Sequence, residues 1–231
     1  FIDDRDYIEK APKNHTGMLV IKDGVQEEKP PLVGLVWAAS ADGIGLSRTL
    51  VPNYNGTDWI RTIITLGGRF FLIYDDMKIN EDGKYIFENT WQTLGNIRLA
   101  GNRFDVMHQG VMMNIQNLDE SSMRSYERYG HFIKYWKLEY PYPYADQEHV
   151  LRQVKEELEY KAGERSSFIN VLSGTKSEKP CVDAKRLNDS TICILEDGKE
   201  IYAVFNTVST ANIESDGKFH MIYDNDILAA G

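Results

Sequence analysis

Cysteines are scarce in this sequence, long apolar runs are absent, and basic residues are fewer than acidic ones. Two cysteines in 231 residues are too few for a disulfide scaffold, and too few by themselves for a structural zinc site. No apolar run approaches the roughly 18 residues that a membrane-spanning helix needs. The 26 Lys and Arg against 35 Asp and Glu give a formal net charge of −9. That charge disfavours nucleic acid and anionic lipid as partners, although a local basic groove is still compatible with it.

The chain also lacks a recognisable signal peptide, and it begins at Phe1 rather than at a Met. This start is typical of a mature protein or an excised fragment. The two cysteines, Cys181 and Cys193, either pair across a hairpin or remain two buried thiols. The turn-like segment 188–190 lies off-centre between them. We therefore expect two buried thiols.

Turn signals are dense along the chain. Hydrophobic residues make up 42% and charged residues 26%, as in a folded globular protein. Five Asp-Gly dipeptides begin at positions 23, 42, 82, 197 and 216, and Gly67-Gly68 is a sixth candidate turn. Such pairs supply the positive φ that tight hairpin turns require. Many short strands joined by hairpins are thus expected.

Between these turns the side chains alternate with a period of two. Tyr85, Phe87, Asn89 and Trp91 fall on one face of a strand. After the turn at 197, the apolar residues at 201, 203 and 205 are expected to lie opposite those at 192 and 194. No domain boundary is visible. The pattern predicts an all-β protein, a large antiparallel β-sandwich built from hairpins, as a single domain over 1–231.

One segment disagrees with this pattern. Val150, Leu151, Val154 and Leu158 stand at i, i+1, i+4 and i+8, and Gly163 is suited to cap a helix. Periodicity alone therefore indicates a helix over 149–163.

Several segments carry a resemblance to a known family. The central run reads VPNYNGTDWIRTI from Val51, GRFFLIYD from Gly68 and YIFENTWQTLG from Tyr85. Segments 14–24, 142–146 and 163–168 extend the match on either side. Together they resemble the β-sandwich portion of heparinase II/III-like polysaccharide lyases, over roughly residues 12–205.

The resemblance implies a fold and a location. In that family a catalytic helical toroid precedes a large antiparallel sandwich of the super-sandwich type, so the toroid would lie before Phe1. The family has a strand where the helical period appears, and we therefore expect a strand over 149–160. Because these lyases act on exported polysaccharides, the resemblance also implies a periplasmic or cell-surface protein of a bacterium.

The resemblance makes His15 the candidate catalytic residue. A β-elimination requires a group that neutralises the uronate carboxylate, a base that removes the α-proton, and an acid that protonates the leaving oxygen. A histidine at this place would point into the cleft shared with the toroid and assist the first or second step. The alternative is a surface histidine in a turn.

A zinc site is the second feature that the resemblance implies. Relatives can hold a structural zinc with His and Asp ligands, and Asp75 or Asp76 matches the Asp position. Gln92 stands where a histidine is expected after Trp91. An amide is a poor zinc ligand, so we expect no metal and no cofactor. Gln92 then becomes a candidate substrate-binding residue.

Further substrate-binding candidates are Arg61, Asp58, Tyr142 and Tyr144. A guanidinium binds a carboxylate in a bidentate manner, which suits a uronic acid. The alternative is an internal ion pair of Arg61 with Asp58 or Asp75. The two tyrosines, on a Pro-extended segment, suit a sugar-stacking platform, although aromatic residues are equally common in sandwich cores and edges.

Three functions follow as hypotheses. The first is the C-terminal sandwich of a polysaccharide lyase, which lines the cleft, is inactive alone, and has a uronic-acid-containing polysaccharide and the toroid as partners. The second is a stand-alone carbohydrate-binding module. The third is a purely structural sandwich of a bacterial surface protein.

Overall fold

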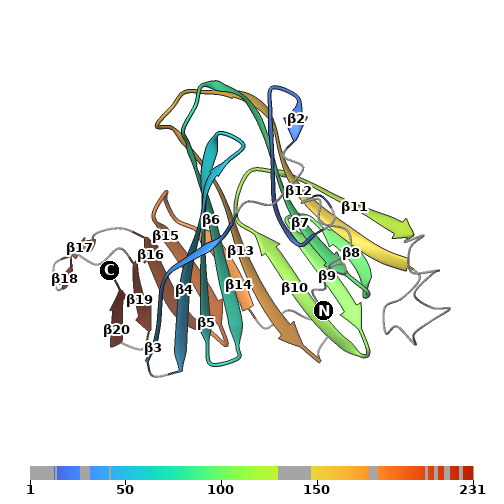
Figure 1. The fold of residues 1–231 in the computed structure, drawn as a ribbon. Helices are drawn as coiled ribbons and strands as arrows, with labels where there is room; N and C mark the ends of the chain where they lie inside the picture. Colours follow the sequence, from blue (N-terminus) through green and yellow to red (C-terminus); the bar gives the residue numbers. More distant parts are fainter. Residues whose placement is uncertain are drawn as a thin grey trace.

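The computed structural model describes residues 13, 15–26, 32–41, 43–129, 147–176, 182–205, 208–210, 213–215, 219–223 and 226–230. Every strand or turn named below lies in these ranges, and no α-helix occurs in them. Accordingly, the described residues contain no helix that is long and apolar enough to cross a membrane. The predicted all-β antiparallel fold is confirmed (Figure 1).

An eight-stranded antiparallel sheet, called the central sheet below, forms the middle of the protein. In spatial order its strands are β3 (Gly34–Ala41), β4 (Ile44–Tyr54), β5 (Thr57–Leu66), β6 (Phe70–Ile79), β13 (Arg165–Thr175), β10 (Val111–Asn117), β9 (Arg103–His108) and β8 (Asn96–Ala100). Neighbours along β3–β6 and β8–β10 are joined by hairpins, whereas β13 inserts between β6 and β10 from a distant part of the sequence.

Two five-stranded sheets pack on the central sheet. The first outer sheet contains β11 (Ser122–Tyr129), β12 (Gln147–Tyr160), β7 (Gly83–Thr93), β1 (Gly17–Lys22) and β2 (Val25–Gln26). The second outer sheet contains β14 (Val182–Arg186), β15 (Thr191–Glu196), β16 (Lys199–Phe205), β19 (Phe219–Tyr223) and β20 (Asp226–Ala230). A separate pair is formed by β17 (Val208–Thr210) and β18 (Ile213–Ser215).

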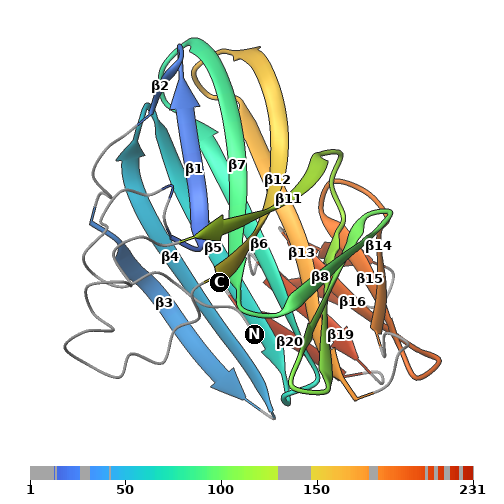
Figure 2. The ribbon, with the colours of Figure 1, turned by 90° about the vertical axis from the view of Figure 1, so that its right-hand side faces the viewer.

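The outer sheets cover opposite faces of the central sheet (Figure 2). Successive side chains of a strand point to opposite faces, so each central strand supplies both layers. On β6, Phe70 and Leu72 pack against the second outer sheet, in a cluster that includes Ile194 and Ile201. The layer toward the first outer sheet is filled by two further apolar clusters.

The predicted turns are largely confirmed. Left-handed φ values occur at Asp23-Gly24 (49° and 76°), Gly67-Gly68 (48° and 71°) and Asp197-Gly198 (48° and 79°). Gly43 has a φ of 79°, while Asp42 and the pair at 216–217 lie outside the described residues. The prediction of a hairpin at Asp82-Gly83 is wrong. That segment instead carries the chain from β6 of the central sheet to β7 of the first outer sheet.

Segment 149–160 is a strand, as expected from the resemblance, and its helical period has a structural cause. It belongs to β12, which pairs with β7 and β11. Val150 and Leu151 are both 0% exposed, although adjacent residues of a strand point to opposite faces. The register then shifts between Lys155 and Leu158. A strand that is buried on both sides in its first part and is then interrupted by a bulge imitates the spacing of a helix.

The hairpin of β15 and β16 has the predicted pairing, with Ile192 opposite Ala203 and Ile194 opposite Ile201. Cys193 is a free, buried thiol that lies opposite Lys185 in the pairing of β14 with β15. Cys181 lies outside the described residues. A buried thiol at Cys193 agrees with the expectation for this residue.

Candidate functional site

The first candidate site is built around a buried ion pair on the central sheet. Arg61 on β5 lies directly opposite Asp75 on β6. Its Nε donates to Oδ1 of Asp75 at 2.6 Å, and its Nη2 donates to Oδ2 at 3.0 Å. The indole N–H of Trp59 also donates to Oδ1, at 2.8 Å. The Asp75 side chain is 0% exposed, so the guanidinium provides the counter-charge that this buried carboxylate requires.

Two tryptophans and an amide enclose this ion pair. The guanidinium carbon of Arg61 lies 5.0 Å from the ring centre of Trp59 and 5.9 Å from that of Trp91. Asn89 on β7 donates to Oδ2 of Asp75 at 3.4 Å. The ion pair thus links the central sheet to the first outer sheet. Of the two internal partners considered for Arg61, the structure shows Asp75.

Arg61, Asp75 and Asn89 form a polar cluster in the layer between the central sheet and the first outer sheet. Along β6, Asp75 stands between Ile73 of one apolar cluster and Met77 of the other. Along β7, Asn89 stands between Phe87 and Trp91 of the same two clusters. The polar cluster therefore separates the two apolar clusters, and its residues have an internal structural role.

A pocket of about 510 Å³ opens beside Arg61, whose side chain is 16% exposed. Its lining is mostly apolar and comprises Thr16, Arg61, Ile63, Gly68, Arg69, Phe70, Phe71, Ile73, Trp91, Met113, Leu172, Ser173 and Gly174. Arg69, the other cation of this pocket, is paired with Glu196. Both guanidinium groups are thus already engaged by carboxylates of the protein.

The structure places His15 near this pocket but not in its lining. His15 is half-buried in a bend just before β1. The next residue, Thr16, lines the pocket, and its hydroxyl accepts a hydrogen bond from the backbone N–H of Gln92 at 3.1 Å. The Gln92 side chain is buried, at 1% exposure. The segment carrying His15 and the end of β7 carrying Gln92 are therefore brought together.

Asp58 does not join this group. In the regular pairing of β5 with β6, residues 58 and 61 point to opposite faces of the central sheet. The Asp58 carboxylate accepts from the backbone N–H of Asn53 at 3.0 Å and from Nδ2 of Asn80 at 2.7 Å. These bonds close the loops at this end of β4 and β6. Tyr142 and Tyr144 lie outside the described residues.

The two acids expected at the zinc position of the family face opposite ways. Asp75 is engaged by Arg61. On the other face, Asp76 accepts from Nε of Arg165 at 3.1 Å and from its Nη2 at 2.5 Å. No group of three or more His, Cys, Asp or Glu suited to a metal was found among the described residues. Neither aspartate is therefore free to act as a ligand without giving up an arginine.

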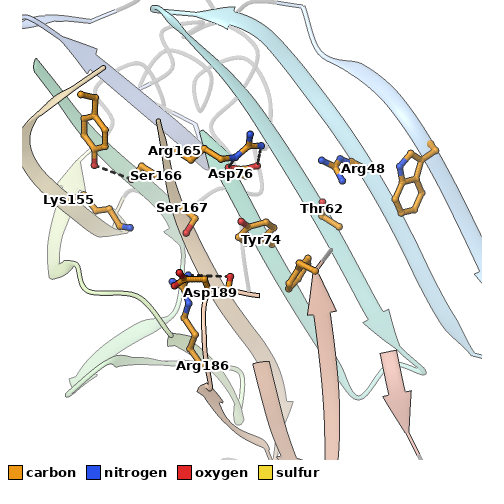
Figure 3. Close-up of a pocket in the computed structure, with 13 residues that line it drawn as sticks. Arg48, Thr62, Tyr74, Asp76, Lys155, Arg165, Ser166, Ser167, Arg186 and Asp189 are labelled. Carbon is orange, nitrogen blue, oxygen red and sulfur yellow. Dashed lines mark hydrogen bonds and ion pairs between the residues drawn. The ribbon is translucent and has the colours of Figure 1, made fainter. Parts of the chain in front are cut away.

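A second candidate site lies on the face of the central sheet that carries Asp76. It is a cavity of about 700 Å³ (Figure 3). Its lining residues are Trp37, Arg48, Thr62, Tyr74, Asp76, Lys155, Tyr160, Arg165, Ser166, Ser167, Arg186, Asp189 and Phe205. This cationic cavity, as it is called below, is bordered by Phe205 at the end of β16 and by the loop after β14. It therefore lies where the second outer sheet stops covering the central sheet.

The floor of the cationic cavity is one row of directly paired residues. Trp37 is opposite Arg48, Arg48 is opposite Thr62, and Thr62 is opposite Tyr74. Residues paired in this way share a face, so the row crosses four adjacent strands. At one strand spacing per step the row extends for ~14 Å.

Charges of the cavity wall are only partly neutralised within the protein. Four cations line it against two carboxylates. Arg165 is paired with Asp76, and Arg186 donates from Nη1 to the buried Asp119 at 2.7 Å. Within the described part of the chain, Arg48 is half-buried and has no carboxylate partner. In a protein with a formal net charge of −9, this is a local excess of positive charge.

Burial also changes the acid–base behaviour of the cavity. It raises the pKa of Tyr74 to about 12, with a further contribution from the charge of Asp76. It lowers the pKa of Lys155, against the attraction of Asp119. It raises the pKa of Asp119 despite the nearby Lys155 and a hydrogen bond from the backbone of Ile169. The shift of Tyr74 extends the pH range in which its hydroxyl is neutral from about 10 to about 12.

Reasoning from the sequence did not identify the cationic cavity. A signal was present, because three of the four floor residues continue the alternation of a core strand. Arg48 follows Leu46 by two residues, Thr62 precedes Ile64, and Tyr74 follows Leu72. At these positions the polar residue lies where the second outer sheet ends.

No family model and no curated protein sequence matches this chain. Solved structures do. The chain matches the heparan sulfate lyase HepC from Pedobacter heparinus with a TM-score of 0.58 and 16% identity, over 80% of this chain and 29% of that one. A heparinase III with methylated lysines matches with a TM-score of 0.61 and 15% identity, over 87% and 32%. Another heparinase III structure gives 0.55 and 11%, over 82% and 29%.

The chain thus spans about a third of the length of these lyase structures. At 11–16% identity the likeness concerns the fold. The β-sandwich expected from the sequence resemblance is thereby confirmed: this chain has the fold of one part of the heparinase III and heparan sulfate lyase structures.

Proposed function

We propose that this chain is the β-sandwich domain of a polysaccharide lyase that acts by β-elimination on a uronic-acid-containing polysaccharide. The observation that carries the proposal is the extent of the fold likeness. Between 80% and 87% of this chain aligns with 29–32% of each lyase structure. A domain that reproduces one part of a larger enzyme is expected to work with the remaining part.

In this proposal the sandwich lines a cleft that a helical toroid completes, and it is inactive alone. His15, beside the pocket at Arg61, is the residue that this chain contributes to the chemistry, as a base or as a group that neutralises the uronate carboxylate. Tyr142 and Tyr144 are proposed to contact substrate around it, and Gln92, whose side chain is buried, is proposed to support this wall through the hydrogen bond of its backbone N–H to Thr16. Asp58 lies on the opposite face of the central sheet and is not part of this wall. Arg61 already has an internal partner, and its contribution is to hold the sheets that form this wall.

The setting proposed for the parent enzyme is the periplasm or the surface of a bacterium, where exported polysaccharides are found. A stand-alone carbohydrate-binding module is the second candidate function. It is favoured by the cationic cavity, which is suited to an acidic ligand without any catalytic partner. Reading the gene upstream of the codon for Phe1 separates the two candidates, since only the lyase requires a helical region there.

Two activity measurements test the lyase proposal. The isolated chain, incubated with heparin, heparan sulfate or alginate, is expected to give no rise in the absorbance of unsaturated uronate. In the full-length parent, His15→Ala is expected to lower turnover by roughly 100-fold, the effect of losing one acid–base or electrostatic group.

The matched control is His108→Ala, which removes a half-buried histidine at the end of β9, outside the pocket beside Arg61. It should leave turnover unchanged. Lyase activity of the isolated chain would refute the proposal that the sandwich is inactive without the toroid. Equal turnover of the two variants would remove His15 from the mechanism.

A further inference from the structure

Among the described residues, one of the three arginines that line the cationic cavity has no carboxylate partner. Arg165 is neutralised by Asp76, and Arg186 is held by Asp119. Lys155 lies within the electrostatic influence of the same Asp119. Arg48, in contrast, is half-buried and has no carboxylate partner among the described residues. A half-buried guanidinium without a carboxylate partner is available to an anion from outside the protein.

The neighbours of Arg48 indicate what kind of anion would satisfy it. Trp37 is its direct cross-strand partner on one side, and Thr62 is its partner on the other. Tyr74 continues the row with a second hydroxyl, which is protonated at physiological pH. Ring faces, hydroxyl groups and a planar cation thus alternate along one line, which suits a ligand that carries apolar ring faces, hydroxyls and an acidic group.

The size of the cavity agrees with such a ligand. Its volume of about 700 Å³ falls within the range of small-molecule sites. A guanidinium binds carboxylate and sulfate with the same bidentate geometry, which an ammonium lacks. The other two arginines of the cavity, Arg165 and Arg186, are held by Asp76 and Asp119, so Arg48 is the arginine of this lining that has no carboxylate partner among the described residues.

We infer that the cationic cavity is a binding site for an acidic saccharide, whose carboxylate or sulfate group is bound by Arg48 while a sugar ring packs on Trp37. The inference deepens the proposed function, since it takes the same substrate class. It adds a second site, because the floor row and Arg61 lie on opposite faces of the central sheet. Saccharide bound here is held away from the wall that carries His15.

Calorimetric titration of the 231-residue chain tests this inference. The probes are a heparin tetrasaccharide, which carries sulfate and carboxylate, a tetragalacturonate, which carries carboxylate only, and the neutral maltotetraose. Acidic probes should bind and the neutral probe should not. Arg48→Gln should weaken binding by roughly tenfold or more, as expected for a lost charge-assisted bidentate bond. Arg48→Lys should retain part of the affinity, because the charge remains and the fork is lost.

Arg124→Gln is the matched control. Arg124 is paired with Glu156 on the first outer sheet and does not line the cavity, and its substitution removes one positive charge, as Arg48→Gln does. It should bind every probe like the wild type. Circular dichroism of each variant establishes that it is folded. If Arg48→Gln does not fold, Arg48→Lys tests the inference in its place. Arg48→Lys must then bind the acidic probes more weakly than Arg124→Gln does.

Three results would overturn the inference. They are an absence of binding by both acidic probes, equal affinity of wild type and Arg48→Gln, and equal loss in Arg124→Gln. Competition by inorganic sulfate at the same concentration as the tetrasaccharide would reduce the site to a simple anion site and overturn its saccharide character. Since these measurements concern equilibrium binding by the isolated chain, failure here leaves the lyase proposal standing, and a parent without lyase activity leaves this site standing.

Discussion

At the scale of single residues, buried carboxylates of this protein are paired with arginines. Asp75 is paired with Arg61, and Asp76 is paired with Arg165. The two aspartates are adjacent in sequence, so their side chains lie on opposite faces of the central sheet. Asp119, which is buried beside β13, is paired with Arg186. Such pairs do not necessarily increase stability over an apolar core, but removing one partner is unfavourable because the other charge stays buried.

The first prediction concerns Arg61. Arg61→Ala should lower the free energy of unfolding by roughly 3–5 kcal/mol, because Asp75 would keep its charge without a counter-charge. Urea unfolding of the isolated chain measures this value. Arg124→Ala is the comparison, since the Arg124–Glu156 pair is exposed and should contribute about 0–1 kcal/mol. A change below that of Arg124→Ala would indicate that Arg61 is present for a ligand rather than for the fold.

The second prediction concerns Tyr74 and alkaline pH. Its pKa of about 12 in the folded state exceeds the ordinary value of 10.0. Because the folded pKa is raised, the contribution of Tyr74 to stability is fully present below pH 10 and is lost as pH rises toward 12. Urea unfolding between these two pH values should therefore show a steeper loss of stability in the wild type than in Tyr74→Phe. Parallel curves for the two proteins would contradict the assignment.

At the scale of elements, glycine turns define the hairpins and a bulge shapes β12. The Asp197-Gly198 turn holds both residues at positive φ, which gives the twist that a two-residue hairpin needs. Asp82-Gly83 has the same letters but a different role, because its flanking strands belong to different sheets. An Asp-Gly dipeptide thus indicates that the chain changes direction. Whether a hairpin forms depends on whether the two flanking strands pair with each other.

The third prediction tests the turn with two glycines that have equal free space. A Cβ at Gly198 would meet no atom within 4 Å, so Gly198→Ala isolates the backbone effect of φ +79° and should be destabilising by about 1 kcal/mol. Gly174 also has open space, but its φ is not positive, so Gly174→Ala should be neutral or slightly stabilising. Thermal unfolding of both variants supplies the comparison. Equal shifts would show that backbone strain is not the cause.

At the scale of the whole molecule, the central sheet supports two outer sheets on opposite faces, and each face has its own candidate site. The pocket beside Arg61 lies toward the first outer sheet, and the cationic cavity lies at the border of the second. The two sites differ in their charges, because both arginines of the pocket beside Arg61 are paired with carboxylates, whereas Arg48 of the cationic cavity has no carboxylate partner among the described residues.

The fourth prediction concerns metal at this scale. We expect the chain to fold and melt identically with and without EDTA, because Asp75 and Asp76 are each held by an arginine and face opposite ways. Differential scanning calorimetry of the purified protein, together with metal analysis, checks this expectation. A lower melting temperature after chelation, or zinc at one equivalent per chain, would contradict it.

The sequence alone determined the fold class, most turns and the pairing of β15 with β16, because alternation and Asp-Gly turns are local properties. The sequence did not determine whether Arg61 pairs with Asp58 or with Asp75. The pairing depends on which face of the sheet each side chain occupies, and that is fixed by the strand register. Residue 58 proved to lie on the opposite face.

Only the tertiary structure decided two further features. It showed why segment 149–160, a strand as the resemblance implies, has a helical period: the adjacent Val150 and Leu151 are both buried, and the register shifts before Leu158. It also assembled the row of Trp37, Arg48, Thr62 and Tyr74 from four strands. No local pattern contains that row, because its members become neighbours only through the register of the central sheet, and the cavity above them exists only because the second outer sheet ends there.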